Sequence, residues 1–402
     1  MTLTSLKSEP ARKSYDVVII GGAAVGSSTA YFLSKNSDFT GSVLVVERDP
    51  GYRFASTALS ASSVRHQFSN AINVKMSQFA SDFIRNFREH LGDPQAPDLS
   101  LKEHGYLFLS PPDRAHILQE NHAVQKSCGA ATLLLSPEEV GAQFPFFNLE
   151  GISLASWNPE GEGWFDGYGM MQTLRSHARA NGVEYVTSEV TGISRAGDRV
   201  SEVMLAGGQS VSCGIIVNAS GPRAAQTAGF AGLKIPVEPR KRCLFVFDCH
   251  TPIAGRMPLT IDPSGVFCRP EGAFYLTGTV PASDPAVAYD DFEVNYAEFE
   301  DLIWPVLANR IPQFEAIKMT SAWAGHYAYN VLDQNVVVGP HNEVGNFLFA
   351  NGFSGHGLQQ SPAIGRGLSE WITYGEYRAL DLTPLGYERV VAGRPFLEQA
   401  II

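Results

Sequence analysis

The strongest constraint on the fold is a glycine-rich turn that lies between an apolar run and a helical pattern. The run Tyr15–Ile20 is rich in β-branched residues, which favours a buried strand, and Gly21–Gly26 follows it directly. A second apolar run, Val43–Val46, ends in Glu47, about twenty residues beyond the turn. The order strand, turn, helix, strand and acid is that of a dinucleotide-binding fold. We therefore expect this segment to bind a dinucleotide, the alternative being a glycine-rich turn that binds nothing.

Each part of this motif has a physical role. Gly21 permits a tight turn, and Gly26 lets the helix pack closely against the strand. The amino end of the helix offers N–H groups and a partial positive charge to a pyrophosphate. Glu47 is able to accept hydrogen bonds from a ribose diol. The binding candidates in this segment are therefore Gly21, Gly22, Ala23, Ala24, Val25, Gly26, Glu47 and its neighbour Arg48.

A stretch of small and hydroxyl-bearing residues follows, from Ser56 to Ser63. Small residues let a loop lie against a flat ligand, and hydroxyl and N–H groups hydrogen-bond to phosphates. The cofactor-binding candidates here are Ser56, Thr57, Ser60, Ala61 and Ser62.

Composition narrows the class of protein. With 402 residues, of which 44% are apolar, the chain is long enough for two domains. Its formal net charge of −11 argues against nucleic acid or an anionic membrane as the main partner. Five cysteines without CxxC spacing predict reduced thiols, with no disulfide framework and no metal site. Residues 1–14 have no signal-peptide core and no apolar run is long enough to span a bilayer, so we expect a cytoplasmic protein.

Two later turns repeat the opening architecture. Asn218–Gly221 and Gly352–Gly357 each follow an apolar strand and precede a helical pattern. Such strand ends bind ligands in open α/β sheets. The chain between them changes character: residues 236–330 alternate strands with many aromatic residues, which predicts a second, mostly antiparallel sheet over the cofactor site.

The expected fold is therefore a mixed α/β fold with a discontinuous, Rossmann-like dinucleotide-binding domain and a second domain that binds substrate. The first comprises residues 1–90, 150–235 and 331–402, and the second comprises residues 91–149 and 236–330. Helical spacing of apolar residues predicts one helix over residues 71–91 and a long helix near residues 291–309.

With these motifs in place, the chain resembles the FAD-dependent amine and amino-acid oxidoreductases of the D-amino-acid oxidase superfamily. The shared marks cover nearly the whole chain in the family order: Val18–Gly26, Glu47, Asp166 before a helix, Val190, Asn218–Gly221 and Gly352–Gly357. Three further stretches resemble a mitochondrial group of oxidoreductase-domain proteins that is implicated in assembly of respiratory complex I: Ala322–Gly325, Asp333–Asn335 and Gly352–Gln360.

The resemblance implies FAD as the cofactor. It implies that the Val190 backbone contacts the adenine end, and that the later turns lie against the phosphates and the flavin ring through Ser220, Gly221, Gly352, Phe353, Ser354, Gly355, His356, Gly357 and Leu358. The position of the cysteine that tethers flavin in some members falls on His326 here. We therefore predict noncovalent FAD, with a histidyl link at His326 as the alternative.

The resemblance also implies a substrate site. Arg65 matches an arginine that binds the substrate carboxylate, whereas the partner lysine of that pattern falls on the uncharged Gln359. Arg242 resembles a substrate arginine of another branch and is a candidate to complete the grip. His326, Tyr327 and Tyr329 are expected to line the cavity opposite Arg65, and His356 is expected to lie next to the flavin or the substrate. The structural alternatives are a salt bridge or flavin contact for Arg65, a solvated strand end for Arg242, and a packed, internally bonded histidine for His356.

The function that these residues imply is oxidation of the C–N bond of an amino acid, either N-substituted or of the D-series, by hydride transfer to the flavin. One alternative is oxidation of a 2-hydroxy acid. Another is a noncatalytic, flavin-stabilised assembly protein. The lysine that assists reaction with oxygen in such oxidases would fall near Leu276 or Thr277 and is absent here. A dehydrogenase that passes electrons to an unknown carrier is therefore an alternative to an oxidase that uses oxygen.

Overall fold

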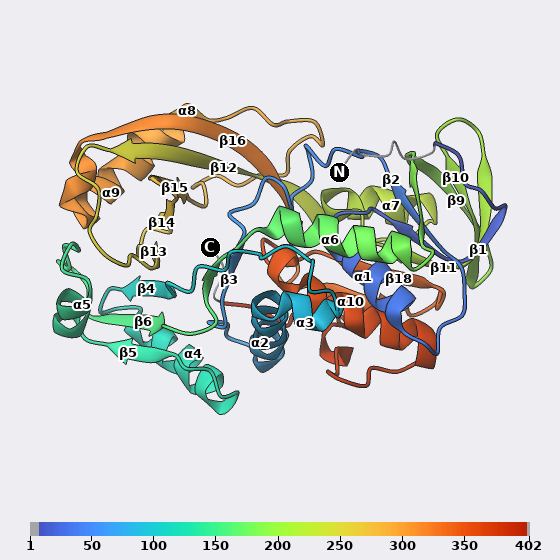
Figure 1. The fold of residues 1–402 in the computed structure, drawn as a ribbon, viewed down its shortest axis with the longest axis horizontal. Helices are drawn as coiled ribbons and strands as arrows, with labels where there is room; N and C mark the ends of the chain where they lie inside the picture. Colours follow the sequence, from blue (N-terminus) through green and yellow to red (C-terminus); the bar gives the residue numbers. More distant parts are fainter. Residues whose placement is uncertain (1–7, 400–402) are drawn as a thin grey trace.

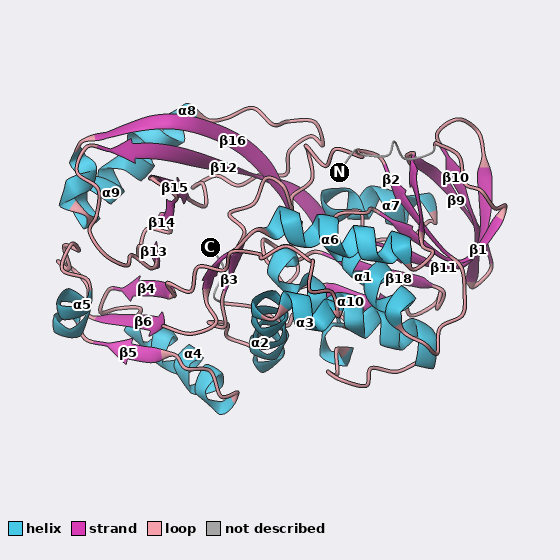
Figure 2. Ribbon diagram, in the orientation of Figure 1, coloured by secondary structure: helices cyan, strands magenta, loops and turns pink. Residues whose placement is uncertain are grey.

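The computed structural model describes residues 8–399 and contains two eight-stranded sheets, one toward each end of an elongated molecule, and one two-stranded sheet (Figure 1). Helices α1, α6 and α10 lie together over the sheet that contains β1 and β2, and the two long strands β12 and β16 lead toward the other end. Figure 2 shows most of the helices gathered around the first sheet, with strands in both parts of the molecule. The expected mixed α/β fold is confirmed.

The first sheet has the strand order β17-β18-β11-β1-β2-β8, and β9 and β10 form an antiparallel extension from β11. All neighbouring strands from β18 to β8 are parallel, whereas β17 pairs antiparallel with β18. The strands are β1 (Ser14–Ile20), β2 (Val43–Glu47), β8 (Glu184–Thr187), β9 (Val190–Ala196), β10 (Arg199–Leu205), β11 (Ser210–Asn218), β17 (Val337–Pro340) and β18 (Phe347–Asn351).

Both faces of this sheet are covered, which explains its nearly continuous apolar strands. One apolar cluster packs α1 and α10 against Val17, Ile19 and Val45, and the other covers Val18 and Leu44. The covering helices are α1 (Ala24–Lys35), α2 (Ala71–Arg85), α3 (Phe87–Leu91), α6 (Gly167–Ala180), α7 (Ala224–Phe230), α10 (Gly357–Tyr374) and α11 (Glu388–Val391).

Helix α1 begins directly after the glycine turn and packs tightly on it. A Cβ atom added at Gly26 would lie 1.8 Å from the carbonyl oxygen of Gly21, which no side chain tolerates. The glycine therefore fixes the amino end of α1 against the carboxyl end of β1, where neighbouring parallel strands open a crevice for a ligand.

The second sheet has the strand order β16-β12-β15-β14-β13-β4-β6-β5 and is antiparallel except for the pair β13 and β4. Its strands are β4 (Tyr106–Ser110), β5 (Leu133–Leu135), β6 (Leu154–Asn158), β12 (Val237–Cys249), β13 (Leu259–Ile261), β14 (Phe267–Glu271), β15 (Phe274–Gly278) and β16 (Ile317–Asn330). Its helices are α4 (Ala115–Ser127), α5 (Pro137–Gln143), α8 (Tyr296–Glu298) and α9 (Trp304–Arg310). The short strands β3 (Ser63–Val64) and β7 (Gly163–Trp164) pair between the two sheets.

Three details differ from the sequence expectations. The helix expected over residues 71–91 is interrupted at Asn86. The helix expected near 291–309 starts only at Tyr296, because Asp291 pairs with Lys241 and Phe292 stacks on His326. It also contains a π-helical segment, Phe299–Ile303. Strand β6 pairs with β4 in the second sheet, whereas the expected domain boundary at residue 150 assigns β6 to the dinucleotide-binding domain.

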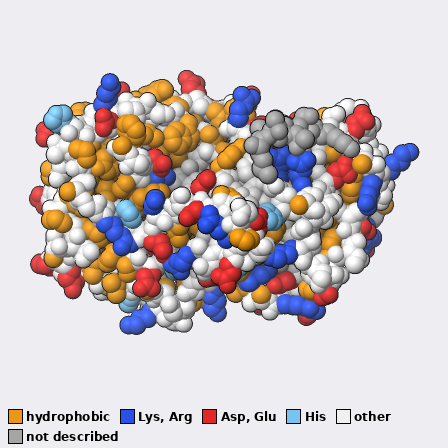
Figure 3. All heavy atoms as spheres, viewed as in Figure 1, with side chains coloured by type: hydrophobic (Ala, Val, Ile, Leu, Met, Phe, Trp, Pro, Cys, Tyr) orange, Lys and Arg blue, Asp and Glu red, His pale blue; other side chains and the backbone are white. Residues whose placement is uncertain are grey.

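On the face that Figure 3 shows, acidic and basic side chains are interspersed among apolar and other residues. Within residues 8–399, no helix combines the length and apolar character needed to cross a membrane.

Candidate active site

A cavity of about 660 Å³ lies where the carboxyl ends of β1, β2 and β11 meet strands β12 and β16 of the second sheet. Its volume falls within the usual range for small-molecule sites, roughly 300–1,000 Å³. The wall includes the amino ends of α1 and α10, the loop from Arg48 to Ser63, and the loop that carries Tyr289 and Phe292. Both sheets therefore contribute to one site.

At one end of the cavity, the wall is made by the glycine turn and the acid after β2. Ala23, Ala24 and Val25 line the cavity at the start of α1, where helix N–H groups have no partner within the helix. Glu47 is buried and accepts hydrogen bonds from the N–H groups of Gly22, at 2.7 Å, and Asp49, at 2.8 Å. Burial raises the pKa of Glu47, and the two N–H donors oppose that change. The glycine turn thus orients the carboxylate that faces the cavity.

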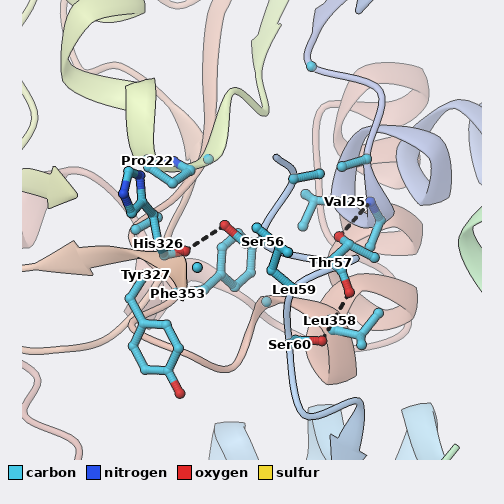
Figure 4. Close-up of a pocket in the computed structure, with 18 of the residues that line it drawn as sticks. Val25, Ser56, Thr57, Leu59, Ser60, Pro222, His326, Tyr327, Phe353 and Leu358 are labelled. Carbon is cyan, nitrogen blue, oxygen red and sulfur yellow. Dashed lines mark hydrogen bonds between the residues drawn. The ribbon is translucent and has the colours of Figure 1, made fainter. Parts of the chain in front are cut away.

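The hydroxyl-rich loop links the two sheets. Figure 4 shows Ser56 donating a hydrogen bond to the carbonyl oxygen of His326, at 2.6 Å. The hydroxyl of Thr57 accepts one from the N–H of Ala24, at 3.3 Å, and Ser60 donates to the carbonyl oxygen of Thr57, at 3.0 Å. These bonds fold the loop into a wall between α1 and β16.

Most of the residues expected at the cofactor site lie on this wall. They are Gly21, Ala23, Ala24, Val25, Glu47, Arg48, Ser56, Thr57, Ser60, Ala61, Ser62, Val190, Ser220, Gly221, Phe353, Gly355, His356, Gly357 and Leu358. Four expected residues lie behind it: Gly22, Gly26, Gly352 and Ser354. The N–H of Gly22 donates to Glu47, and the backbone N–H of Ser354 donates to the carbonyl oxygen of Ala328, so both residues support the wall from behind.

At the other end of the cavity, Arg65 follows β3 and is only 2% exposed. Its Nη2 lies 2.9 Å from Nε2 of His356, and its backbone N–H donates to Oε1 of Gln359, also at 2.9 Å. His356 and Gln359 come from the start of α10, so this helix positions the arginine. Gln359, at the position of the family lysine, acts on the backbone of Arg65 and adds no second charge.

The electrostatics of this group favour a charged arginine and a neutral histidine. Burial lowers the pKa of Arg65, yet an arginine stays protonated because its ordinary pKa is so high. Burial and the positive charge of Arg65 hold the pKa of His356 well below its usual range. The guanidinium also lies over the rings of Phe68, at 4.6 Å, and Phe108, at 5.3 Å.

Arg242 lies on the wall but is bonded within the protein. Its Nη1 and Nη2 donate to the two oxygens of Asp284, at 2.6 and 2.7 Å, and Nη1 also donates to the carbonyl oxygen of Lys241, at 2.9 Å. The Arg242 guanidinium lies 4.9 Å from the centre of the Tyr327 ring. Burial lowers the pKa of Arg242, but the hydrogen bonds and charge of Asp284 outweigh it and raise the pKa. A substrate carboxylate at Arg242 would have to compete with Asp284.

His326 faces the cavity with its ring stacked on Phe292, the ring centroids 4.3 Å apart. Its Nε2 is 2.6 Å from the carbonyl oxygen of Asp291, so this nitrogen is the donor. Burial lowers its pKa, which favours the neutral imidazole. Figure 4 shows the ring of His326 near Pro222, with the ring of Tyr327 pointing in a different direction.

Sequence reasoning missed three groups at this site. Tyr106 forms part of the cavity wall beside Arg65, Asp284 pairs with Arg242, and Glu162 holds the segment around Arg65 from behind. The apolar run at Tyr106 predicts a buried strand residue and nothing more, and the other two residues lie in segments without a motif. Pairing of charges over such distances in sequence leaves no local signal.

The chain is similar in sequence to known proteins along nearly all of its length. The family model described as "FAD dependent oxidoreductase" (DAO) matches residues 16–371, and the chain belongs to this family. A curated relative from Xenopus laevis, "FAD-dependent oxidoreductase domain-containing protein 1", is 40% identical over 422 residues, which is 96% of this chain and 85% of the relative. Mitochondrial sarcosine dehydrogenase from Mus musculus is 23% identical over 387 residues, covering 92% of this chain and 40% of that protein.

Among solved structures, L-proline dehydrogenase from P. horikoshii is similar with a TM-score of 0.82 and 27% sequence identity. The similarity covers 97% of this chain and all of that chain, 100%. The protein is therefore an FAD-dependent oxidoreductase, and the predicted cofactor is confirmed by the family.

The residues present fit this cofactor. A helix amino terminus borders the cavity beside a short glycine turn, which suits a pyrophosphate, and the oriented carboxylate of Glu47 suits a ribose diol. The amino end of α10 supplies a second set of helix N–H groups at Gly357 and Leu358. These residues would hold FAD along the cavity.

Proposed function

We propose that the protein oxidises the C–N bond of an amino acid, N-substituted or of the D-series, to an imine that water hydrolyses. The observation that carries this proposal is the buried guanidinium of Arg65 on the cavity wall, beside the neutral imidazole of His356. A buried, charged fork of N–H donors suits a carboxylate. Two similar proteins are named for amino-acid substrates, sarcosine dehydrogenase and L-proline dehydrogenase, which supports the same class.

In this proposal, the chain's own residues bind and orient the substrate. Arg65 donates hydrogen bonds to the carboxylate, each worth about 1.5–3 kcal/mol. Gln359 fixes the backbone of Arg65, and His356 fixes one edge of its guanidinium. A neutral His356 adds no second positive charge near the amine, whose lone pair must be free to stabilise the product. Bound FAD supplies the acceptor for the hydride equivalent that leaves the carbon next to nitrogen.

The proposed electron acceptor is oxygen or a carrier, and the proposed location is the cytoplasm. The five cysteines are all free thiols in the structure, which suits a reducing compartment.

The test is the visible spectrum of the purified flavoprotein, mixed without oxygen with D-, L- and N-methyl amino acids and with the matching 2-hydroxy acids. Bleaching of the flavin band by amino acids alone would support the proposal. Bleaching by 2-hydroxy acids alone would replace it with 2-hydroxy-acid oxidation. A stable band with every compound would contradict both and favour a noncatalytic role with a protein partner. Admitting air after bleaching tests oxygen as the acceptor.

A further inference from the structure

The second sheet presents a row of apolar residues to the cavity next to Arg65. The row crosses four neighbouring strands, β12, β15, β14 and β13. Its residues pair directly across these strands in the order Leu244, Gly278, Phe267 and Ile261. Leu244, Phe267 and Ile261 line the cavity. We call these residues, together with Leu259 and Tyr106, the apolar floor.

Leu259 and Tyr106 extend the floor by one row. Leu259 lies two residues before Ile261 and therefore on the same face of the sheet, and it pairs with Tyr106 across β13 and β4. Both line the cavity. The floor therefore spans strands β12 to β4, and the tyrosine hydroxyl is the polar group among its residues. The neighbouring Thr279 also lines the cavity, but its hydroxyl donates to the carbonyl oxygen of Val280, at 3.4 Å.

Gly278 lets this floor close. A Cβ atom added at Gly278 would lie 2.9 Å from Cδ2 of Leu244 and 3.0 Å from Cε1 of Phe267. The two side chains thus lean toward each other over the glycine. The result is a continuous apolar surface in the middle of the sheet face.

The floor adjoins the proposed carboxylate site. The Arg65 guanidinium lies 5.9 Å from the ring centre of Tyr106 and 5.3 Å from that of Phe108, the next residue but one on β4. A ligand carboxylate bound to Arg65 would therefore place its remaining atoms near the floor.

The two arginines on the strands next to floor residues, Arg269 and Arg242, are already paired with acids. Arg269 shares the face of Phe267, but its guanidinium donates to the carbonyl oxygen of Ala61, at 2.8 Å, and pairs with Glu271. Arg242 is paired with Asp284. The described acids on the cavity wall are Glu47, Asp49 and Glu189, at the dinucleotide end, and Asp290, beside Tyr289. A charged substrate group on the floor would lose its water without gaining a partner.

We propose that the apolar floor makes the substrate an amino acid with an apolar side chain or ring, and that it excludes acidic and basic side chains. This inference rests on the proposed function, because Arg65 is its carboxylate anchor. Burial of apolar surface supplies the binding free energy, and desolvation of a charge supplies the discrimination.

The binding test uses holoenzyme and three carboxylates that share one carboxyl group and differ at the far end. They are 4-methylpentanoate, glutarate and 4-aminobutanoate, measured by calorimetry. We expect 4-methylpentanoate to bind at least about tenfold more tightly than the other two, as apolar pockets discriminate by such factors. Equal binding, or tighter binding of either charged compound, would overturn the inference.

Two variants and a control locate the effect. Ile261→Thr and Leu244→Thr should each weaken binding of 4-methylpentanoate at least about threefold and leave binding of acetate unchanged. Thr260→Val is the control, because Thr260 is buried on the other face of β13 and is not part of the cavity wall. Loss of binding in the control alone, or unchanged binding in both floor variants, would contradict the inference.

The flavin spectrum separates failure of this inference from failure of the proposed function. Leucine, aspartate and lysine in D-, L- and N-methyl forms are compared without oxygen. Faster bleaching by leucine derivatives supports the inference. Equal or faster bleaching by aspartate or lysine derivatives overturns it and leaves amino-acid oxidation in place. If no amino acid bleaches the flavin band, the proposed function is contradicted. In that case the binding of the three carboxylates alone tests the apolar floor.

Discussion

Nη2 of Arg65 and Nε2 of His356 lie 2.9 Å apart, so two side chains that can both carry positive charge share a hydrogen bond in the cavity wall. A guanidinium has donors and no acceptor, and Nε2 must therefore offer its lone pair. His356 is then neutral with its proton on Nδ1. The ring centroids of Phe68 and His356 lie 4.9 Å apart in an edge-to-face arrangement, which further excludes water. The pair therefore consists of one charged guanidinium and one neutral imidazole.

The first prediction concerns His356 and acid. Burial and the charge of Arg65 hold its pKa well below 6.5 in the folded protein. Below pH 6.5 the unfolded chain binds a proton here that the folded chain does not, so the free energy of unfolding falls as the pH falls. His356→Gln keeps an acceptor for Arg65 and removes the titration. Thermal unfolding from pH 5 to 8 should show a smaller acid-side loss in this variant.

His116→Gln is the matched control, since His116 is an exposed helix residue. It should keep the pH dependence of the unchanged protein. An acid-side loss in His356→Gln that equals that of the control would show that His356 is not the neutral, buried acceptor described above.

The second prediction concerns Arg65. Arg65→Gln removes the charge and the fork of donors while keeping a polar side chain. Loss of one charge-assisted hydrogen bond costs about 1.5–3 kcal/mol, so KM for the amino-acid substrate should rise at least about tenfold. The FAD content should stay near one per chain. Steady-state kinetics and the flavin absorbance measure both, and a loss of FAD with unchanged KM would assign Arg65 to the cofactor.

The dinucleotide half of this site could be predicted from sequence because its signals are local. The turn Gly21–Gly26, the strand before it and Glu47 lie within one βαβ unit, and each follows from a backbone requirement. The later turns at Ser220 and Gly355 repeat the pattern of strand, small residues and helix. The two-sheet architecture followed from the change in periodicity after residue 236.

The proposed substrate half was harder to predict from the sequence, because its geometry depends on pairing between residues that are far apart in the chain. Arg242 was identified as a cation, yet its partner Asp284 is 42 residues away in a loop without a motif. The start of the helix near Tyr296 was missed because the contacts of Asp291 and Phe292 with strands β12 and β16 override local helical preference. Strand β6 joins the second sheet through long-range pairing with β4, which periodicity does not encode.

The third prediction concerns the buried Glu162. Its carboxylate accepts from the N–H of His66 at 2.6 Å, from Nε2 of Gln67 at 2.8 Å and from Nδ2 of Asn158 at 3.0 Å, and so it holds the two residues after Arg65. Burial raises its pKa to about 7. The folded protein therefore binds a proton that the unfolded chain has lost, and the free energy of unfolding falls as the pH rises from 4.5 to about 7.

Glu162→Gln should remove this alkaline-side loss, and Glu160→Gln, at an exposed neighbouring position, should not. Glu162→Ala leaves buried donors without an acceptor. It should lower the free energy of unfolding by about 1–3 kcal/mol for each donor left unpaired. Thermal unfolding at pH 5, 6 and 7.5 compares the variants. An unchanged profile in Glu162→Gln would contradict the raised pKa.

The fourth prediction concerns the cofactor. Glu47→Gln keeps the shape of the side chain but weakens its hydrogen bonds to a ribose diol, so FAD should bind about 10-fold more weakly, or worse. Equilibrium dialysis of FAD measures this. Acid precipitation of the unchanged protein should leave all flavin in the supernatant, because His326 stands where some family members have the tethering cysteine. Since Nε2 of His326 donates to the carbonyl oxygen of Asp291, a histidyl link would have to use Nδ1. Flavin in the pellet that is lost in His326→Ala would establish a histidyl link.

The fifth prediction ranks the two arginines on the cavity wall. Asp284 already accepts from both Nη atoms of Arg242, so a substrate carboxylate would have to displace this acid before it could bind there. Arg242→Gln should therefore raise KM less than Arg65→Gln does, at equal FAD content. It should lower stability more than a surface change, because it leaves Asp284 without its partner. Arg242→Gln combined with Asp284→Asn removes both charges and should restore part of that stability. If KM rises as much as in Arg65→Gln, and stays raised in the double variant, then Arg242 binds the substrate carboxylate directly and the substrate displaces Asp284.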